Sequence, residues 1–316
     1  MKVVASLAAV LAAVALAACG GDGAEPGASE EATLVLDFQP NAAHAGIYAA
    51  LGDGLYSDRG VELTVREPSA SSDAPKLLEA GRADFAILDI HDLAIARERG
   101  FDVVAIAPIV QRPLAAVIAG DRDAVREPAD LEGGEVGVTG LPSDEAVLDS
   151  VLEAGDADPD TVGRVTIGFE AVPQLSAGRL DAATAFWNAE GVALRRAGAA
   201  TREFRVDDYG APRYPELVLV TSGPDARLAE EVRAATAAGY ERVVNDPGHG
   251  LDALLAEAGG LDAKEQRAQL DALIAADAFA PPGRFDEGAL REWAEWDLEH
   301  GIVTEPIDVA EAFETG

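Results

Sequence analysis

The stretch LVLDFQPNAAHAGIYAA, residues Leu34 to Ala50, has the pattern of a strand, a polar loop and a helix. An apolar run ends in polar residues, and apolar residues then recur at helical spacing. The carboxyl end of a strand and the start of the next helix share one edge of an open α/β sheet. We therefore expect the loop to border a ligand cleft with the side chains of Asp37, Phe38, Asn41 and His44. The alternative is that Phe38 packs in the core, Asn41 caps the helix and His44 lies on the surface.

Beyond this stretch, strand-like and helix-like segments alternate, which predicts α/β layers with a largely parallel sheet. The pattern Gly-Arg-x-Asp occurs twice, at Gly81–Asp84 and at Gly178–Asp181, each time before a buried strand. Two lobes of similar build are the simplest explanation of this repeat.

Polar and aromatic residues follow several of the predicted strands, where they would face the same cleft. In the first predicted lobe these are Ser69, Asp89 and Gln111; in the second they are Ser143, Trp187, Asn188, Glu190 and Tyr209. Four of them also have structural explanations. Asp89 could be a helix N-cap, Glu190 a solvated helix residue, Trp187 a core residue and Gln111 a loop residue.

The composition is that of a globular protein with an acidic surface. Its 316 residues and 48% hydrophobic content are enough to fill two cores. Asp and Glu total 57 against 24 Lys and Arg, for a net charge of −33. This charge repels phosphate backbones, so we expect no nucleic acid partner, and it disfavours strongly anionic ligands unless an arginine is placed beside them.

The N-terminus resembles a bacterial lipoprotein signal. An apolar run follows Lys2 and ends in Leu16-Ala17-Ala18-Cys19-Gly20. In such proteins the cysteine is lipidated and becomes the first mature residue, so Cys19, the single cysteine of the sequence, would be consumed by the anchor. An ordinary secretory signal would give Cys19 no such role. Residues 19–32 are small, acidic and patternless, as expected of a flexible tether.

The runs DFQPNAAHAGIYAA, GLYSDRGVELTV, GRADFAI and VQRPLAAVIA, together with W-N-x-E and Y-G-x-P-x-Y-P, resemble the substrate-binding lipoproteins of ABC importers in the thiamine-pyrimidine group. This group is related to the fungal pyrimidine-precursor synthases and more distantly to sulfonate and taurine receptors. The resemblance implies a type II periplasmic-binding-protein fold, in which two α/β lobes joined by two hinge strands close on the ligand. It places lobe I at residues 33–118 and 219–316, lobe II at 119–218, and the signal at 1–18.

The resemblance also implies a function: a receptor, anchored on the extracytoplasmic side of the cell membrane, that delivers a hydroxymethyl- or formyl-aminopyrimidine to an ABC permease. Phe38 or Trp187 would stack on the ring, Glu190 or Asp89 would accept from its amine, and Asn41 would pair with the ring edge. We expect a monomer with no cofactor, no metal and no enzymatic activity. The alternatives are a receptor for riboflavin or for a sulfonate such as taurine, and a pyrimidine-precursor synthase that uses pyridoxal phosphate and a histidine of its own.

Overall fold

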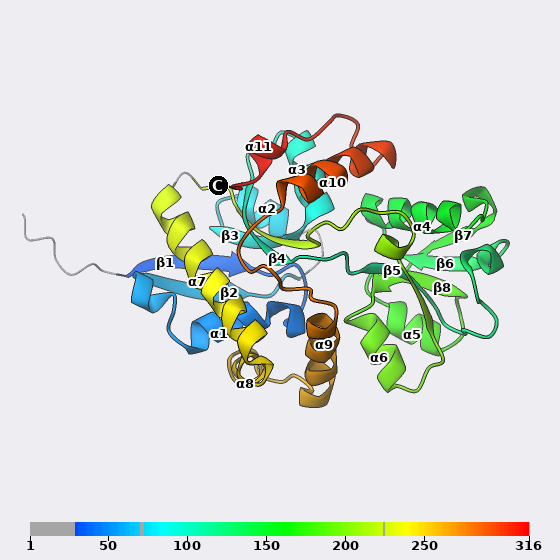
Figure 1. Ribbon diagram of the computed structural model, residues 1–316, viewed down its shortest axis with the longest axis horizontal. Coiled ribbons are helices and arrows are strands. Elements are labelled where there is room, and N and C mark those ends of the chain that lie inside the picture. Colours follow the sequence, from blue (N-terminus) through cyan, green and yellow to red (C-terminus); the bar gives the residue numbers. More distant parts are fainter. Residues whose placement is uncertain (1–28, 70–72, 224, 316) are drawn as a thin grey trace, which may run out of the picture.

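The computed structural model describes residues 29–69, 73–223 and 225–315. The predicted signal peptide, the predicted lipidation site Cys19 and most of the predicted tether lie outside these ranges. Within them the chain forms two five-stranded sheets, each flanked by helices, in two lobes that lie side by side (Figure 1). The predicted α/β class with two lobes is confirmed.

The sheet of lobe I contains four strands that run in one direction and one strand that runs against them. β1 pairs in parallel with β2 and β3, whereas β10 runs antiparallel between β3 and β4. In order across the sheet, the strands are β2 (Val61–Arg66), β1 (Glu30–Val35), β3 (Phe85–Asp89), β10 (Leu217–Thr221) and β4 (Val104–Val110).

The first strand corrects the predicted tether, because β1 begins at Glu30 and so includes residues that were assigned to it. Glu30 pairs with Val61 of β2, and Ala32 is buried against the core. Backbone pairing holds these residues in the sheet, and acidic side chains on the exposed face do not prevent it.

The sheet of lobe II repeats this arrangement. β6 pairs in parallel with β7 and β8, and β5 runs antiparallel between β8 and β9. Across the sheet the strands are β7 (Gly163–Thr166), β6 (Glu135–Val138), β8 (Ala182–Phe186), β5 (Ala115–Ala119) and β9 (Arg202–Arg205). Each sheet therefore receives its antiparallel strand directly after the chain has left the other lobe.

The two crossovers between the lobes lie before β5 and before β10, which shifts the predicted lobe boundaries. Residues 115–118 were assigned to lobe I but pair with β8 and β9, and residues 217–218 were assigned to lobe II but pair with β3 and β4. An apolar run shows that a strand is buried without showing which sheet it joins. The crossovers themselves are residues 111–114 and the segment that follows β9.

The repeated Gly-Arg-x-Asp motif makes the same turn in both lobes. Gly81 and Gly178 each have φ 61°, in the left-handed region where a side chain would be strained. Asp84 accepts a hydrogen bond from a backbone amide of β1 at 2.8 Å, and Asp181 accepts one from an amide of β6 at 2.9 Å. In each lobe the motif therefore fixes the strand that follows it against the first parallel strand.

Helices cover both faces of each sheet (Figure 1). On one face of lobe I lie α1 (Ala45–Gly52), α7 (Ala226–Asn245), α8 (Pro247–Ala258) and α9 (Ala263–Ala275), and on the other lie α2 (Asp73–Glu79), α3 (Ile90–Glu98), α10 (Glu287–Glu299) and α11 (Val309–Ala312). In lobe II, α4 (Pro142–Ala154) lies opposite α5 (Ala171–Ser176) and α6 (Glu190–Arg196). Within the described ranges no helix is both long and apolar enough to cross a membrane.

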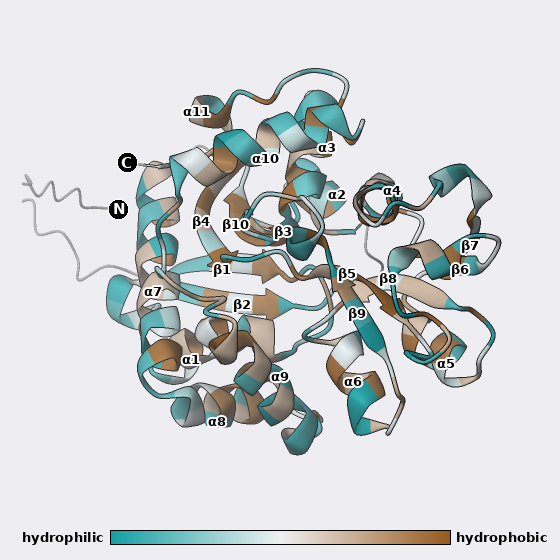
Figure 2. Ribbon diagram, turned by 45° about the vertical axis from the view of Figure 1, so that its right-hand side comes forward, coloured by the Kyte–Doolittle hydropathy of each residue, from teal (hydrophilic) through white to brown (hydrophobic). Residues whose placement is uncertain are grey.

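Two clusters of buried apolar side chains lie on opposite sides of the sheets and continue from one lobe into the other. Leu34 and Leu36 belong to one cluster and Val35 to the other, as the alternation of a strand requires. Figure 2 shows hydrophobic strands at the centre and hydrophilic outer helix faces. Trp293 and Trp296 of α10 are buried in the second cluster, which confirms that they are packing residues.

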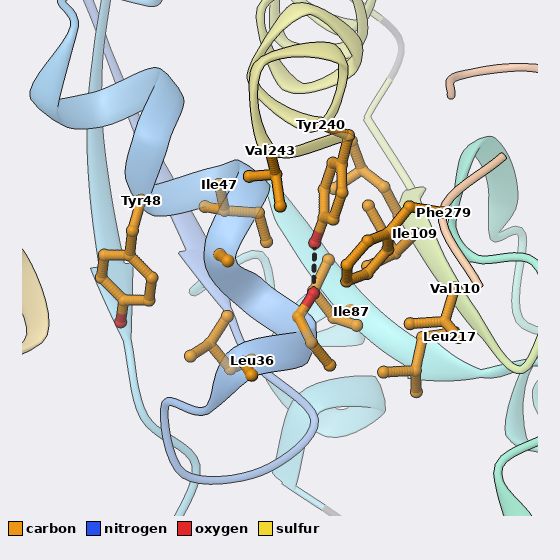
Figure 3. Packing of buried hydrophobic residues seen from close by; sticks show 14 of the residues in the cluster. Leu36, Ile47, Tyr48, Ile87, Ile109, Val110, Leu217, Tyr240, Val243 and Phe279 are labelled. Carbon is orange, nitrogen blue, oxygen red and sulfur yellow. Dashed lines mark hydrogen bonds between the residues drawn. The ribbon is translucent and has the colours of Figure 1, made fainter. Parts of the chain in front are cut away.

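The closest helix packing in lobe I joins α1 to α7, where Gly46 faces Tyr240. The Tyr240 ring lies beside Phe279, and its hydroxyl donates to the carbonyl oxygen of Ala43 at 2.6 Å (Figure 3). This contact anchors the loop between β1 and α1, whose polar residues border the candidate site.

Candidate ligand-binding site

A cleft lies between the two lobes, at the carboxyl ends of β1 and β3 in lobe I and of β6, β7 and β8 in lobe II. It encloses a cavity of about 120 Å³. Seven of the residues predicted from the sequence line it: Asp37, Phe38, Asn41, Asp89, Ser143, Asn188 and Glu190. They come from the four stretches that end or follow β1, β3, β6 and β8, brought together at the sheet edges.

The loop after β1 combines a structural and a cleft-facing role. Asn41 caps the short 3₁₀ helix Ala42–His44, its Oδ1 accepting from the amide of Ala43 at 2.8 Å, and it also lines the cleft. Both explanations of this residue therefore hold. The cap fixes the direction in which the loop leaves the strand.

His44 corrects both sequence-based expectations, since it neither lines the cleft nor lies on the surface. It is 0% exposed. Its Nδ1 accepts from the amide of Asn41 at 3.2 Å, which leaves Nε2 to donate to Oδ1 of Asp37 at 2.8 Å. His44 therefore holds Asp37 in position at the cleft edge and does not reach a ligand.

Trp187 also differs from the prediction of a ring that stacks on the ligand. It is 0% exposed, and its indole donates to the carbonyl oxygen of Pro113 in the first crossover at 3.0 Å. The guanidinium of Arg205 lies over the ring, 4.2 Å from its centroid. The side chain turns away from the cleft because the core and the crossover take up its surface.

Three further predicted residues do not line the cleft. Ser69 is exposed and bonds to Asp73 at the start of α2, with its amide at 2.9 Å and its hydroxyl at 2.6 Å. Gln111 donates to the carbonyl oxygens of Pro281 and Arg284, the second at 2.9 Å. Tyr209 packs edge-on against Phe204 with ring centroids 5.8 Å apart. Each of these side chains serves a local or interlobe contact that the sequence does not reveal.

Two aromatic residues in the cleft were missed. Phe169 and Phe186 follow β7 and end β8, so the strand-end rule that identified Phe38 also applies to them. Phe169 is 48% exposed, and its ring meets the ring of Phe38 edge-on across the cleft at 4.8 Å between centroids. The two lobes thus bring one aromatic ring each into edge-to-face contact at one position of the cleft.

Two carboxylates of the cleft were also missed, Asp92 of α3 and Asp144 of α4. Asp92 comes three residues after Asp89 and so lies on the same helix face, which the sequence could have shown. Burial raises the pKa of Asp92 to about 7, with Asp89 and Asp144 adding to the effect. Burial also raises the pKa of Asp144 and of Glu190, despite hydrogen bonds from Thr139 to Asp144 and from Phe186 to Glu190.

The lining of the cleft is therefore acidic. Five carboxyl residues line it, namely Asp37, Asp89, Asp92, Asp144 and Glu190, and no lysine or arginine lies among its described lining residues. Within the part of the chain that the structure describes, no group of three or more His, Cys, Asp or Glu side chains is arranged to hold a metal ion.

Asp89 joins the cleft to the crossovers. It caps α3 by accepting from the amide of His91 at 2.8 Å, and its carboxyl lies beside that of Glu216. Burial raises the pKa of Asp89 well above its usual range, with Glu216 as the next cause, and burial likewise raises the pKa of Glu216. Two adjacent buried carboxylates cannot both stay ionised, so we infer that the pair shares one proton.

The charge of this pair is balanced from behind by His91, which is buried in lobe I. Its Nδ1 lies 2.7 Å from Oδ1 of Asp297 on α10. Burial opposes a charged imidazole, but the carboxylates of Asp297 and Asp89 outweigh it and raise the pKa of His91 to about 10. The carboxylates around His91 therefore favour its charged form behind the Asp89 end of the cleft.

Asn188 is the clearest sign of a missing ligand group. The residue is 1% exposed and lines the cleft, and its side-chain oxygen has no hydrogen-bond partner among the described residues. A buried amide oxygen without a partner costs about 1–3 kcal/mol, so this atom is placed to accept from an N–H or O–H group that enters the cleft.

Comparison with known proteins agrees with a binding site. The family model described as NMT1/THI5 like matches residues 41–249. A formylaminopyrimidine-binding protein from Halalkalibacterium halodurans is 30% identical over 316 residues, covering 96% of each chain. A 4-amino-5-hydroxymethyl-2-methylpyrimidine phosphate synthase from Legionella pneumophila is 25% identical over 175 residues, which is 55% of each chain.

Among solved structures, the alkanesulfonate-binding protein SsuA from Xanthomonas axonopodis pv. citri, bound to MOPS, is similar with a TM-score of 0.71. Its sequence identity is 18%, and the match covers 92% of this chain and 100% of that chain. This similarity supports the type II periplasmic-binding-protein fold and does not bear on the ligand. The family match over residues 41–249 and the full-length relative lead to one conclusion: this chain belongs to the NMT1/THI5-like family.

Proposed function

We propose that the protein is the extracytoplasmic substrate-binding component of an ABC importer and that it captures an aminopyrimidine precursor of thiamine, of the hydroxymethyl or formylamino type. The observation that carries this proposal is the lining of the cleft, which combines aromatic rings from both lobes with hydrogen-bond acceptors. The similarity to a formylaminopyrimidine-binding protein supports the same class of ligand.

An aminopyrimidine matches this lining group by group. Its flat ring can pack against Phe38 and Phe169, which contributes roughly 0.5–1.5 kcal/mol beyond the area buried. Its exocyclic amine needs acceptors, and the oxygen of Asn188 and the carboxylate of Glu190 supply them. Closure of the lobes about the crossovers would remove water from these hydrogen bonds, and the closed form would be the one that the permease binds.

The acidic lining argues against the alternative receptors. A sulfonate such as taurine would meet five carboxyl residues and no basic side chain among the described lining residues. Riboflavin carries three fused rings and a ribityl chain. A cavity of about 120 Å³ suits a single substituted ring, since it holds roughly ten groups of the size of water.

A synthase that uses pyridoxal phosphate also fits this cleft poorly. The cofactor needs a lysine for its aldehyde and cationic or amide groups for its phosphate, and the described lining offers carboxylates instead. His44, the histidine of the first loop, is buried behind Asp37 and does not face the cleft. The residues present therefore do not fit this cofactor, and we propose a receptor without enzymatic activity.

For its place in the cell, we propose a lipid anchor at Cys19, a flexible tether up to β1, and a monomer that docks on the membrane permease. The support for the anchor is the sequence Leu16-Ala17-Ala18-Cys19-Gly20, which resembles a lipoprotein signal.

A thermal-shift titration of the full chain in mild detergent tests the proposed function. The ligands are the hydroxymethyl- and formylamino-pyrimidines, riboflavin and taurine. At about 100 times its Kd a specific ligand adds roughly 2.7 kcal/mol of stability, so we expect a clear rise in melting temperature with an aminopyrimidine and none with the other two.

Variants of two predicted site residues make this test specific. Asn188→Leu keeps the number and branching of the side-chain heavy atoms and removes the unpartnered oxygen, so the ligand-induced rise should be lost while the unliganded melting temperature stays near that of the wild type. Tyr209→Phe, outside the cleft, should respond like the wild type. A rise with taurine alone would overturn the ligand assignment, and no rise with any compound would overturn the receptor proposal.

A further inference from the structure

Two carboxylates from opposite lobes face each other across the cleft. Asp92 belongs to α3 of lobe I and Asp144 to α4 of lobe II, and both line the cavity. Asp92 senses the other lobe, since the Asp144 carboxylate is among the charges that disfavour its ionisation. Bringing the lobes together therefore moves like charges toward one another.

These carboxylates differ in how their oxygens are satisfied. Asp144 accepts from the amide of Thr139 at 2.9 Å and from its hydroxyl. No hydrogen bond or salt bridge joins the Asp92 carboxylate to another described residue. Asp92 thus has its full capacity to accept hydrogen bonds from a group in the cleft.

A second, independent observation points to the same kind of group. The oxygen of Asn188 is buried in this cleft without a partner among the described residues. The atoms that await a ligand are therefore acceptors, and the side chains near them are negatively charged when ionised. A protonated amine, which offers three N–H donors and a positive charge, satisfies both conditions.

We propose that the ligand bears a protonated amino group which binds between Asp92 and Asp144 and draws the two lobes together. This inference rests on the proposed function, keeps its aminopyrimidine ring, and replaces the neutral hydroxymethyl or formylamino substituent by a cationic one, such as an aminomethyl group. Without the cation, repulsion between the two carboxylates favours the open form. When the cation is bound, the carboxylate of each lobe binds the same ammonium group, which favours the closed form.

The geometry favours an organic cation over a metal ion. The described residues contain no cluster of carboxylates arranged to hold a metal. The aromatic rings of Phe38 and Phe169 line the same cavity and would pack against the ring that carries the amine.

Calorimetric titration of the full chain in mild detergent tests the proposal with a matched pair of ligands, at a chosen pH of about 7.5. One is the aminopyrimidine with an aminomethyl group, and the other is the same compound with that amine formylated and hence neutral. We expect the amine to bind at least about 10-fold more tightly, as charge-assisted hydrogen bonds would require.

Asp92→Asn and Asp144→Asn should each weaken binding of the amine about 10-fold or more and change the affinity for the formylated compound little. Glu153→Gln, an exposed position on α4 outside the cleft, removes the same charge and should change neither affinity. Melting temperatures of the variants establish that they fold, and we expect Asp92→Asn to melt no lower than the wild type because it relieves a buried charge.

The possible outcomes separate the two proposals. Equal affinity for both compounds, tighter binding of the formylated one, or a preference that the Asp92 and Asp144 variants leave unchanged would overturn the cationic ligand and leave the aminopyrimidine receptor intact. Failure of both compounds to bind the wild type would instead overturn the proposed function.

Discussion

Replacing Gly239 with alanine is expected to lower the free energy of unfolding by about 3 kcal/mol. Gly239 lies in α7 where this helix crosses α1. A Cβ atom there would lie well inside the van der Waals contact distance of the Gly46 carbonyl oxygen and only 2.8 Å from Cβ of Ala50. Because the nearest atom belongs to the backbone, the helices themselves would have to separate.

Gly46→Ala should have an effect of the same size from the other side of the contact. Its Cβ would lie 2.6 Å from Cδ1 of Tyr240 and closer still to two other ring atoms. The ring cannot turn aside at low cost, since Phe279 lies beside it and the carbonyl oxygen of Ala43 holds its hydroxyl (Figure 3).

Urea unfolding of the two variants, followed by circular dichroism, measures this effect. Gly52→Ala is the matched control, because Gly52 ends the same helix α1 and its Cβ would meet nothing closer than 3.7 Å. The control should stay within about 1 kcal/mol of the wild type or gain stability. Equal stability of the Gly239, Gly46 and Gly52 variants would show that the helices are not packed this closely.

Glu216→Leu is expected to destabilise the protein by roughly 2–5 kcal/mol, although it removes a buried carboxyl group that lies beside Asp89. Glu216 is 0% exposed and lies at the end of the second crossover. Its Oε2 accepts from the amides of Leu114 and Ala115, the second at 3.3 Å, where the first crossover enters β5. The leucine would leave both amides buried and unpaired at the point where the crossovers meet.

Glu216→Gln separates the loss of these hydrogen bonds from the loss of charge. The glutamine keeps an oxygen for the two amides, so its cost should be about 1 kcal/mol in the same urea experiment. If the leucine and glutamine variants are equally stable, Glu216 does not hold the crossovers together. In that case the link from Asp89 through Glu216 to the crossovers would lose its basis.

Much of the fold could be predicted from local patterns. Apolar runs bounded by turn residues predict strands at Val61–Arg66 and Leu217–Thr221, where β2 and β10 are observed. The Gly-Arg-x-Asp repeat predicted two similar lobes because the left-handed glycine and the aspartate that binds a backbone amide are both local features. The sheet that β5 joins depends on contacts between residues that are distant in sequence. For this reason residues 115–118 of β5 were predicted in the wrong lobe.

From the sequence, only those site residues could be predicted that directly follow a predicted strand. Asp37, Phe38 and Asn188 were found because they follow strands, and the same rule applied more widely would have included Phe169 and Phe186. Trp187 also follows a strand, yet it donates to Pro113, a residue 74 positions away. Sequence spacing cannot show which of two adjacent side chains turns inward when the partner is that distant.

The sequence could not show that Asp92 and Asp144 line the same cleft, because they meet only where α3 of one lobe faces α4 of the other. The sequence showed a general excess of acid, which is typical of solubility as much as of ligand choice. The structure shows that some of this charge lines the cleft without a basic residue among the described lining residues.

A crystal structure of the chain grown with the formylaminopyrimidine is the most direct test of a cleft that binds aminopyrimidines. We expect the ring between the two lobes, against Phe38 and Phe169, with one of its N–H groups within hydrogen-bond distance of the Asn188 side-chain oxygen. A ring bound outside the cleft, or a closed cleft in which Asn188 bonds to the protein and no ring is present, would contradict this function.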